Sequence, residues 1–150
     1  MELEPSQRLR AAGLKVTKGR VAALEVLETN SHSTADQLHD RIGERGVPMT
    51  LAAVYLSLQV LTDRGVVRRI EPAGGPARYE LRVGDNHHHL VCTRCSAVVD
   101  VDCATGEAPC LRPAETHGFS VATAEITFWG VCPDCAARAA EQPPREEGAA

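Results

Sequence analysis

Two Cys-x-x-Cys pairs constrain the fold of this 150-residue chain more than any other feature. Cys92 and Cys95 form the first pair, Cys132 and Cys135 form the second, and 36 residues (96–131) lie between them. Each pair can present two thiolates from a tight turn, and four sulfur ligands suit Zn(II) in a closed tetrahedral site. The spacing therefore predicts a structural zinc site that ties together two distant segments of the second half of the chain.

Other interpretations of these four cysteines are open from the sequence. The pairs could be redox-active dithiols, or the residues could be ordinary buried thiols. The opening segment "MELEPSQRLRAAG" lacks the apolar stretch of a signal peptide, and no run of about eighteen apolar residues follows. We therefore expect a soluble, cytosolic protein, in which such spacing favours metal or redox chemistry over a disulfide framework.

Two further cysteines, Cys103 and Cys110, lie between the pairs. Their spacing permits a disulfide that responds to oxidation, and it is equally compatible with two structural thiols. They are candidate redox thiols.

The net charge of −4 conceals a difference between the two halves of the chain. Residues 1–83 carry 12 Lys+Arg against 10 Asp+Glu, a net charge of +2, whereas residues 84–150 carry 4 against 10, a net charge of −6. The sequence predicts four segments: a first domain over 1–83, a hinge over 84–86, a second domain over 87–140 and a disordered acidic tail over 141–150.

Helical periodicity is clearest over residues 50–64, where Val54, Leu58 and Leu61 recur on one face. Shorter helical patterns cover "RVAALEVLET" and "ADQLHDRI", with capping residues between them. After residue 65 the period changes, and the strand-like runs "VVRRI" and "ARYEL" flank the turn-forming "EPAGGP". Three helices followed by a hairpin are typical of a winged helix-turn-helix domain.

The second half contains three strand-like runs, "NHHHLVC", "AVVDVD" and "AEITFWGVC". Residues 103–119 give weak signals and are assigned as loops with a short helix. The fold class that we expect is α+β: an N-terminal winged helix-turn-helix domain and a small C-terminal α/β domain with a three-stranded sheet.

A run of three histidines begins the first of these strands. In an extended strand His87 and His89 project to one face and His88 to the other, because side-chain direction alternates. Two imidazoles on one face with carboxylates in reach form a mixed N/O site suited to Fe(II), Mn(II), Zn(II) or Ni(II). The alternative is a polar surface run without a bound metal.

Residues 50–64 can serve as a DNA-recognition helix. The exposed positions expected on it are Ala52, Tyr55, Leu56 and Gln59. This set is apolar, so it favours contacts with thymine methyl groups over a full hydrogen-bond code. A helix that serves only core packing is the alternative. Basic residues placed for phosphate contact are Lys15, Lys18, Arg20, Arg68 and Arg69.

Across about residues 7–136 the chain resembles the ferric uptake regulator family of transcriptional repressors. The resemblance rests on the segments "AAGLKVTKGRVAALEVL", "AVYLSLQVLTDRGVV", "ARYELRVGDNHHHLVC" and "GVCPDC". "VDVDCATGEAPCL" and "FWGVCPDC" are most similar to the actinobacterial FurA/CatR branch, which is associated with control of catalase-peroxidase genes.

The resemblance implies a homodimer that binds an AT-rich palindromic operator in double-stranded DNA through its winged helices. It also implies a C-terminal domain that forms the dimer interface and a regulatory metal ion between the two domains. By position, the family's ligand set falls on His32, Glu80, His87 and His89, and the additional acid of peroxide-sensing members falls on Asp100. One ion with ligands from both domains favours one relative orientation of the domains.

Other positions match the family in part. A second exchangeable metal site would use His88 and Glu107, with Glu125 beside a position where many members have histidine. Tyr55 matches a base-contacting tyrosine, but Leu56 stands where an arginine is common. Arg20 matches an arginine that contacts phosphate or base, and it follows a glycine in place of the usual proline.

We therefore expect a metal-dependent repressor, not an enzyme, with Zn(II) structural and Fe(II) or Mn(II) regulatory. Peroxide could be sensed by oxidation of His32 or His87, or by the thiols. A zinc- or nickel-responsive repressor of the same family is an alternative. A thiol oxidoreductase or zinc enzyme is an alternative of another class, but neither a βαβ pattern around the Cys pairs nor an HExxH motif supports it.

Overall fold

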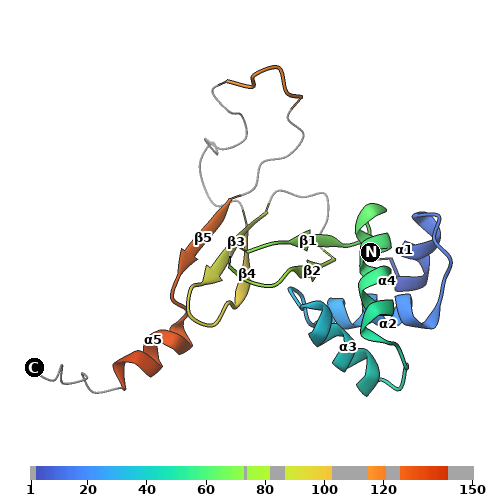
Figure 1. Cartoon of the computed structure of the whole chain (residues 1–150), viewed down its shortest axis with the longest axis horizontal. Coiled ribbons are helices and arrows are strands. Elements are labelled where there is room, and N and C mark those ends of the chain that lie inside the picture. The colour runs from blue at the N-terminus through green and yellow to red at the C-terminus, as the bar shows by residue number, and fades with distance from the viewer. Residues whose placement is uncertain (1–2, 73, 82–86, 103–114, 121–125, 142–150) are drawn as a thin grey trace, which may run out of the picture. The chain divides into compact units, whose positions relative to one another are not determined.

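The computed structural model describes residues 3–72, 74–81, 87–102, 115–120 and 126–141. The chain divides into two compact units, Met1–Asp85 and Asn86–Ala150 (Figure 1). Within the described ranges, no helix combines the length and the hydropathy needed to cross a membrane. Each unit has its own secondary structure and is described by itself.

The first unit contains helices followed by a two-stranded antiparallel hairpin. Its elements are α1 (Pro5–Ala11), α2 (Lys18–Thr29), α3 (Ala35–Glu44), α4 (Leu51–Asp63), β1 (Arg68–Ile70) and β2 (Arg78–Glu80). Helices α2, α3 and α4 and the hairpin confirm the predicted winged helix-turn-helix order. The periodicity did not predict α1, a short helix that buries Leu9.

Threonine caps explain where the three longer helices begin. Thr17, Thr34 and Thr50 each accept a hydrogen bond from a backbone N–H in the first turn of the next helix, at 3.3, 3.2 and 3.2 Å. After α4 the chain turns at Gly65, whose φ of 65° lies in the left-handed region that favours glycine. The cap at Thr50 fixes the start of α4, and the turn at Gly65 leads from its end into the hairpin.

The core of the first unit consists of leucines and small apolar residues from all four helices. Four of these leucines are fully buried, namely Leu24, Leu38, Leu58 and Leu61. Burying one such side chain contributes about 1.5–3 kcal/mol. Because the core takes one face of α4, the opposite face of that helix is left exposed.

The second unit is a three-stranded sheet followed by a helix. Its elements are β3 (His87–Cys92), β4 (Val98–Asp102), β5 (Thr127–Gly130) and α5 (Pro133–Ala140). The strand order is β4-β3-β5, with β3 antiparallel to β4 and parallel to β5. This confirms the predicted α+β class and the three-stranded sheet. Helix α5 was not predicted from the sequence.

The strand register divides the side chains of the sheet between two faces. Leu90 lies opposite Val99 on one side and Phe128 on the other, so the three share a face. They are 46%, 58% and 47% exposed, respectively. His87 and His89 alternate with them and occupy the other face. The sheet therefore has one face with exposed apolar side chains and an opposite face that carries the imidazoles of His87 and His89.

Some predictions fall on other parts of the chain. The proposed hinge at 84–86 and all of the acidic tail except Glu141 lie outside the described residues, so both stay predictions. Residues 103–114 lie outside them too. Of the segment assigned as loops with a short helix, residues 115–119 are described, and they contain a turn.

Candidate metal centres and recognition face

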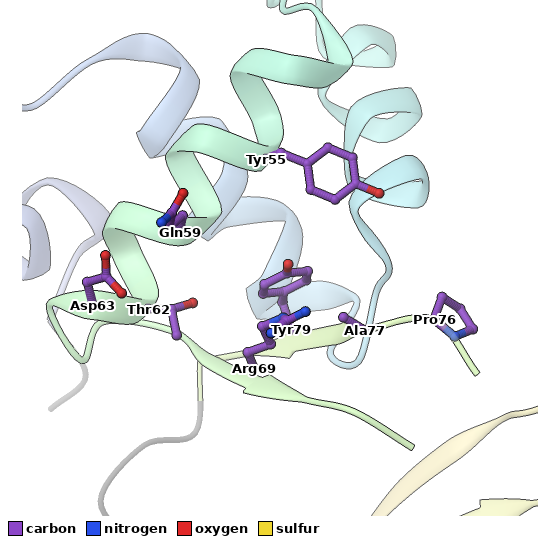
Figure 2. A pocket seen from close by; sticks show the side chains of 8 residues that line it. All are labelled: Tyr55, Gln59, Thr62, Asp63, Arg69, Pro76, Ala77 and Tyr79. Carbon is purple, nitrogen blue, oxygen red and sulfur yellow. The ribbon is translucent and has the colours of Figure 1, made fainter. Parts of the chain in front are cut away.

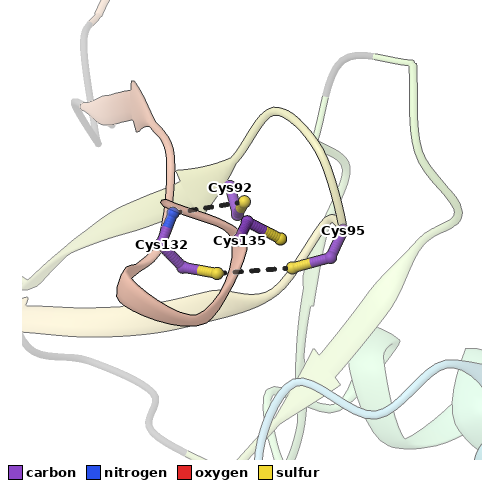
Figure 3. A group of neighbouring side chains, drawn as sticks. All are labelled: Cys92, Cys95, Cys132 and Cys135. Atoms are coloured by element: carbon purple, nitrogen blue, oxygen red, sulfur yellow. Dashed lines mark hydrogen bonds between the residues drawn. The ribbon is translucent and has the colours of Figure 1, made fainter. Parts of the chain in front are cut away.

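The second unit brings four cysteines together. The Sγ atoms of Cys92, Cys95, Cys132 and Cys135 all lie within 4.8 Å of one another (Figure 3). Those of Cys95 and Cys132 are 3.7 Å apart. A tetrahedral ion with Zn–S bonds of about 2.3 Å requires sulfur–sulfur edges of about 3.8 Å. The four thiols therefore have the spacing and the donor chemistry for a closed tetrahedral metal site.

Two tight structures present these thiols. After β3 the chain turns back, and the N–H of Ser96 donates to the carbonyl of Cys92 at 2.9 Å, with Ser96 at a φ of 58°. Cys132 is the N-cap of α5, which places Cys135 in the first turn of that helix. The N–H of Thr93 donates to the carbonyl of Gly130 at 2.8 Å and holds the two segments side by side.

Without a cation the four thiols do not ionise alike. The pKa of Cys92 is lowered to about 6, first because the backbone N–H of Cys132 donates to its Sγ at 3.3 Å, and then because the N–H groups of Cys95 and Arg94 do. The pKa of Cys135 is raised to about 12, first by its contact with the Cys132 thiol and then by burial. Ionisation of the Cys92 thiol is therefore favoured, and ionisation of the Cys135 thiol is opposed. A divalent cation is needed for all four cysteines to be thiolates together.

Arg138 supports this cluster from the second turn of α5. Its Nη2 donates to Sγ of Cys135 at 3.4 Å, and its Nε donates to the carbonyl of Asp134 at 3.2 Å. A guanidinium beside a thiolate offsets part of the negative charge of a four-thiolate site. Arg138 was not among the residues predicted for this site, although its spacing of three from Cys135 would indicate the contact once a helix is assigned there.

A second group of ligand-type residues lies in the first unit. Nε2 of His32 is 2.9 Å from Oε2 of Glu80, and their side chains are 9% and 0% exposed. The two residues are 48 positions apart in the chain. An imidazole and a carboxylate are both ligand types that a mixed N/O metal site uses.

The loop that carries His32 is pinned to strand β2. The N–H of Tyr79 donates to the carbonyl of Ser33 at 3.0 Å, and Nη1 of Arg78 donates to the carbonyl of His32 at 2.9 Å. His32 itself has a φ of 60°, in the left-handed region that residues other than glycine seldom adopt. These contacts hold the imidazole against Glu80 in a conformation that costs backbone energy, which is common at functional sites.

Glu80 also has a cationic neighbour. Nε of Arg68 is 3.7 Å from its Oε1, and the Arg68 side chain is 18% exposed. The two residues lie directly opposite each other in the β1–β2 pair. From the sequence, Arg68 was predicted only as a phosphate contact.

A third group lies on the sheet of the second unit. Nε2 of His87 and Nε2 of His89 are 3.6 and 3.4 Å from Oδ1 of Asp100, and their ring centroids are 4.8 Å apart. Both imidazole side chains are at most 5% exposed, and Asp100 is 24% exposed. The strand alternation therefore places both rings beside one carboxylate, as the sequence analysis expected of that face.

His88 lies on the opposite face of β3. Its ring meets Phe128 edge to face at 6.1 Å, and its Nδ1 is buried without a hydrogen-bond partner among the described residues. The other residues proposed for a second exchangeable site, Glu107 and Glu125, lie outside the described residues. The same holds for the candidate redox thiols Cys103 and Cys110. Both of these sites stay predictions.

The candidate recognition helix presents the expected residues. All four predicted positions are exposed, namely Ala52, Tyr55, Leu56 and Gln59. Tyr55 is 48% exposed and Leu56 is 64% exposed. Tyr55 and Gln59 also border a pocket of about 620 Å³, whose other wall is the hairpin with Arg69 and Tyr79 (Figure 2).

Lys15, Lys18 and Arg20 lie at or just before the N-terminal end of α2. Nη1 of Arg20 donates to the carbonyl of Lys15 at 3.0 Å, and Lys15 is exposed. Gly19 lies between Lys18 and Arg20, where a Cβ atom would come within 2.6 Å of Sδ of Met49. The absence of a side chain at Gly19 thus lets the segment before α4 pack closely against the start of α2.

A sequence model described as the ferric uptake regulator family matches residues 11–129. The chain is 46% identical over 130 residues to the transcriptional regulator FurA of Mycobacterium tuberculosis strain H37Rv, which covers 87% of this chain and 88% of that protein. The solved ferric uptake regulator of Vibrio cholerae has a TM-score of 0.66 and 28% identity, covering 85% of this chain and 98% of that one. The ferric uptake regulator of Pseudomonas aeruginosa, solved with manganese, has a TM-score of 0.65 and 27% identity, covering 87% of this chain and 99% of that one.

Proposed function

The chain belongs to the ferric uptake regulator family, and we propose that it is a homodimeric, metal-dependent repressor that senses iron or peroxide. The curated relatives are named as transcriptional regulators or ferric uptake regulation proteins. The chain is accordingly a transcriptional regulator rather than a thiol oxidoreductase or a zinc enzyme. The ligands, the metals and the operator are the parts that we propose.

One observation carries the regulatory-site proposal: each unit holds a preformed, largely buried set of ligands. His32 and Glu80 are in contact in the first unit, and His87, His89 and Asp100 cluster in the second. Neither set alone gives more than three ligand residues, and Fe(II) or Mn(II) commonly takes more ligands than that. We propose that the two sets bind one regulatory ion.

Such an ion couples metal binding to DNA binding. Because its ligands come from both units, metal binding favours the arrangement of the units in which all ligands reach the ion. A coupling of this kind typically amounts to about 1–3 kcal/mol. The ligand side chains are already held in place, His32 and Glu80 on a pinned loop and a strand, and His87 and His89 on a sheet. Few side-chain rearrangements are therefore needed when the metal ion binds.

The four cysteines are proposed to hold a structural Zn(II). The donor set is all sulfur, which favours zinc over the harder regulatory metals, and the sulfur spacing suits a tetrahedral site. Zinc at this site neutralises thiolate charge and ties the end of β3 to the start of α5. The His, Glu and Asp ligands of the regulatory site instead suit Fe(II) or Mn(II). The second candidate function is a zinc- or nickel-responsive repressor of the same family.

The exposed face of α4 is proposed to read an AT-rich palindromic operator. Its apolar side chains, Tyr55 and Leu56, match the thymine methyl group, which is the apolar feature that A·T pairs present in the major groove. Gln59 can hydrogen-bond an adenine edge, and Lys15 and Arg20 are placed for phosphate contact. A dimer with two such helices binds two half-sites, which explains a palindrome.

The exposed apolar face of the sheet is proposed as the dimer interface. Leu90, Val99 and Phe128 adjoin one another across three strands and are each about half exposed. An exposed apolar patch of this kind on a soluble regulator marks a protein–protein contact. The symmetric partner is a second copy of this chain, because an isologous interface is the commonest route to a dimer.

Peroxide sensing is proposed by one of two routes, and catalase-peroxidase and other oxidative-stress genes are the proposed targets. His32 or His87 could be oxidised beside a bound iron, or Cys103 and Cys110 could be oxidised to a disulfide. The support for this proposal is the similarity to FurA and the presence of these residues.

The proposal is tested by metal analysis of the purified protein combined with operator binding. Binding is titrated separately with Fe(II), Mn(II), Zn(II) and Ni(II), before and after exposure to peroxide. We expect one tightly held zinc per chain, and operator binding that requires added Fe(II) or Mn(II) and is lost after peroxide treatment of the iron form. A response to Zn(II) or Ni(II) alone would favour the second candidate, and binding that ignores both metals and peroxide would refute the sensor proposal.

A further inference from the structure

Strand β1 places an arginine against the buried carboxylate of the regulatory half-site. Arg68 and Glu80 are direct cross-strand partners, and Nε of Arg68 is 3.7 Å from Oε1 of Glu80. The other oxygen, Oε2, is 2.9 Å from Nε2 of His32. The two oxygens of Glu80 therefore face two different partners, one an imidazole that can bind metal and the other a guanidinium that cannot.

A carboxylate with no exposed surface needs compensation for its lost hydration. The Glu80 side chain is 0% exposed, whereas Arg68 is 18% exposed and keeps contact with solvent. Removing one partner from such a buried pair strongly destabilises a protein, because the other charge is left uncompensated. Arginine is permanently charged, so its compensation is present with or without a metal ion.

We propose that Arg68 is the resident counter-ion of Glu80, and that it sets the affinity of the regulatory site for its divalent ion. In the metal-free protein Arg68 stabilises the Glu80 carboxylate within the first unit. When an ion binds, Arg68 lies near a second positive charge and repels it, which lowers metal affinity and raises the metal concentration at which the protein responds. This inference rests on the proposed role of Glu80 as a metal ligand.

The next residue on the strand provides a matched control. Arg69 points away from Glu80 and pairs with Glu71, and both side chains are largely exposed. The same substitution at Arg69 therefore removes one positive charge from β1 without touching the buried carboxylate. Any difference between the two variants reports on the contact with Glu80 and not on net charge.

The first test measures the thermal stability of protein stripped of exchangeable metal. We expect Arg68→Gln to lower the unfolding temperature by about 5 °C and Arg69→Gln to change it by less than about 1 °C. We expect the Arg68→Gln/Glu80→Gln double variant to recover most of the loss, because the buried charge is then absent too. Equal effects of the two single variants, or a double variant no more stable than Arg68→Gln, would overturn the counter-ion role.

The second test measures Mn(II) affinity without DNA, by competition with a chelating indicator. We expect Arg68→Gln to bind Mn(II) about tenfold more tightly than the wild type, and Glu80→Gln to bind it at least about tenfold more weakly. Arg68→Lys and Arg69→Gln should bind Mn(II) about as the wild type does. Unchanged or weaker binding by Arg68→Gln, with Glu80→Gln impaired, overturns the affinity-setting role alone. Unchanged binding by Glu80→Gln overturns the proposed regulatory site itself.

Discussion

Sγ of Cys95 lies 3.7 Å from Sγ of Cys132, although 37 positions of the chain separate them. The contact joins the turn after β3 to the N-cap of α5, so the two ends of the second unit meet at one cluster. Among the described residues, few large apolar side chains of this unit are buried, and Val91 is one of them. We therefore expect a metal ion bound at the four cysteines to have a large share in holding the unit together.

We predict that Cys95→Ser abolishes stoichiometric zinc binding and destabilises the second unit. Three thiolates and a hydroxyl bind zinc much more weakly than four thiolates, and binding free energy at such a site is folding free energy. We expect the unfolding temperature of the second unit to fall by about 10 °C or more, measured by circular dichroism alongside zinc content. Cys110→Ser removes a thiol that is not one of the four proposed ligands, so it serves as the control and should retain zinc. Full zinc content in Cys95→Ser would contradict the site.

Arg138→Ala should weaken zinc binding without removing it. The guanidinium donates a hydrogen bond to Sγ of Cys135 at 3.4 Å, and such outer partners of a metal ligand are typically worth about 10–100-fold in affinity. Zinc loss to a competing chelator measures the effect. Arg138→Lys keeps the charge and should fall between wild type and Arg138→Ala. If all three proteins release zinc alike, Arg138 has no part in the site.

Replacing Leu90 by Asp should convert the dimer to a monomer. Leu90 is 46% exposed at the centre of the apolar face, and a carboxylate there would be buried unpaired in the proposed interface. Analytical ultracentrifugation measures the oligomeric state. Phe119→Asp is the matched control, because Phe119 is 78% exposed and lies outside the sheet. A Leu90→Asp protein that stays dimeric would mean that the chain dimerises through another surface.

Operator DNA in which uracil replaces thymine should bind the protein less tightly. Each lost methyl contact costs about 0.8 kcal/mol, or about fourfold in affinity. The loss should be smaller for Leu56→Ala, because that variant has already lost an apolar contact, and unchanged for Leu3→Ala, whose side chain is exposed at the N-terminal end. Binding of the two DNAs with equal affinity by the wild-type protein would exclude thymine-methyl readout.

Much of the first unit could be predicted from the sequence because its signals are local. The α4 helix has a threonine at residue 50 that caps it and apolar residues on one face, and the structure places both as expected. The helix α5 was missed because it is short and begins with a proline inside the second Cys pair, so the metal motif hid the helical pattern. Local signals therefore predicted the longer helices better than the short ones.

The candidate sites required knowledge of register that the sequence does not carry. Alternation along a strand was enough to place His87 and His89 on one face. The contact of Arg68 with Glu80 depends on which residues pair across a hairpin, and that pairing is set by the connection between β1 and β2. The pinned loop at His32 depends on hydrogen bonds that β2 donates to carbonyls of that loop, which side-chain identity does not indicate.

The central claim is that His87 and His89 supply ligands to the ion that controls DNA binding. Its most direct test is operator affinity as a function of added Fe(II) or Mn(II), compared between the wild-type protein and His87→Ala/His89→Ala. His39→Ala/His117→Ala is the matched control, because neither of these histidines lies near the proposed ligands along the chain. We predict that the wild type and the control bind the operator only with metal, and that His87→Ala/His89→Ala fails to bind it even at saturating metal; operator binding retained by that variant would contradict the account.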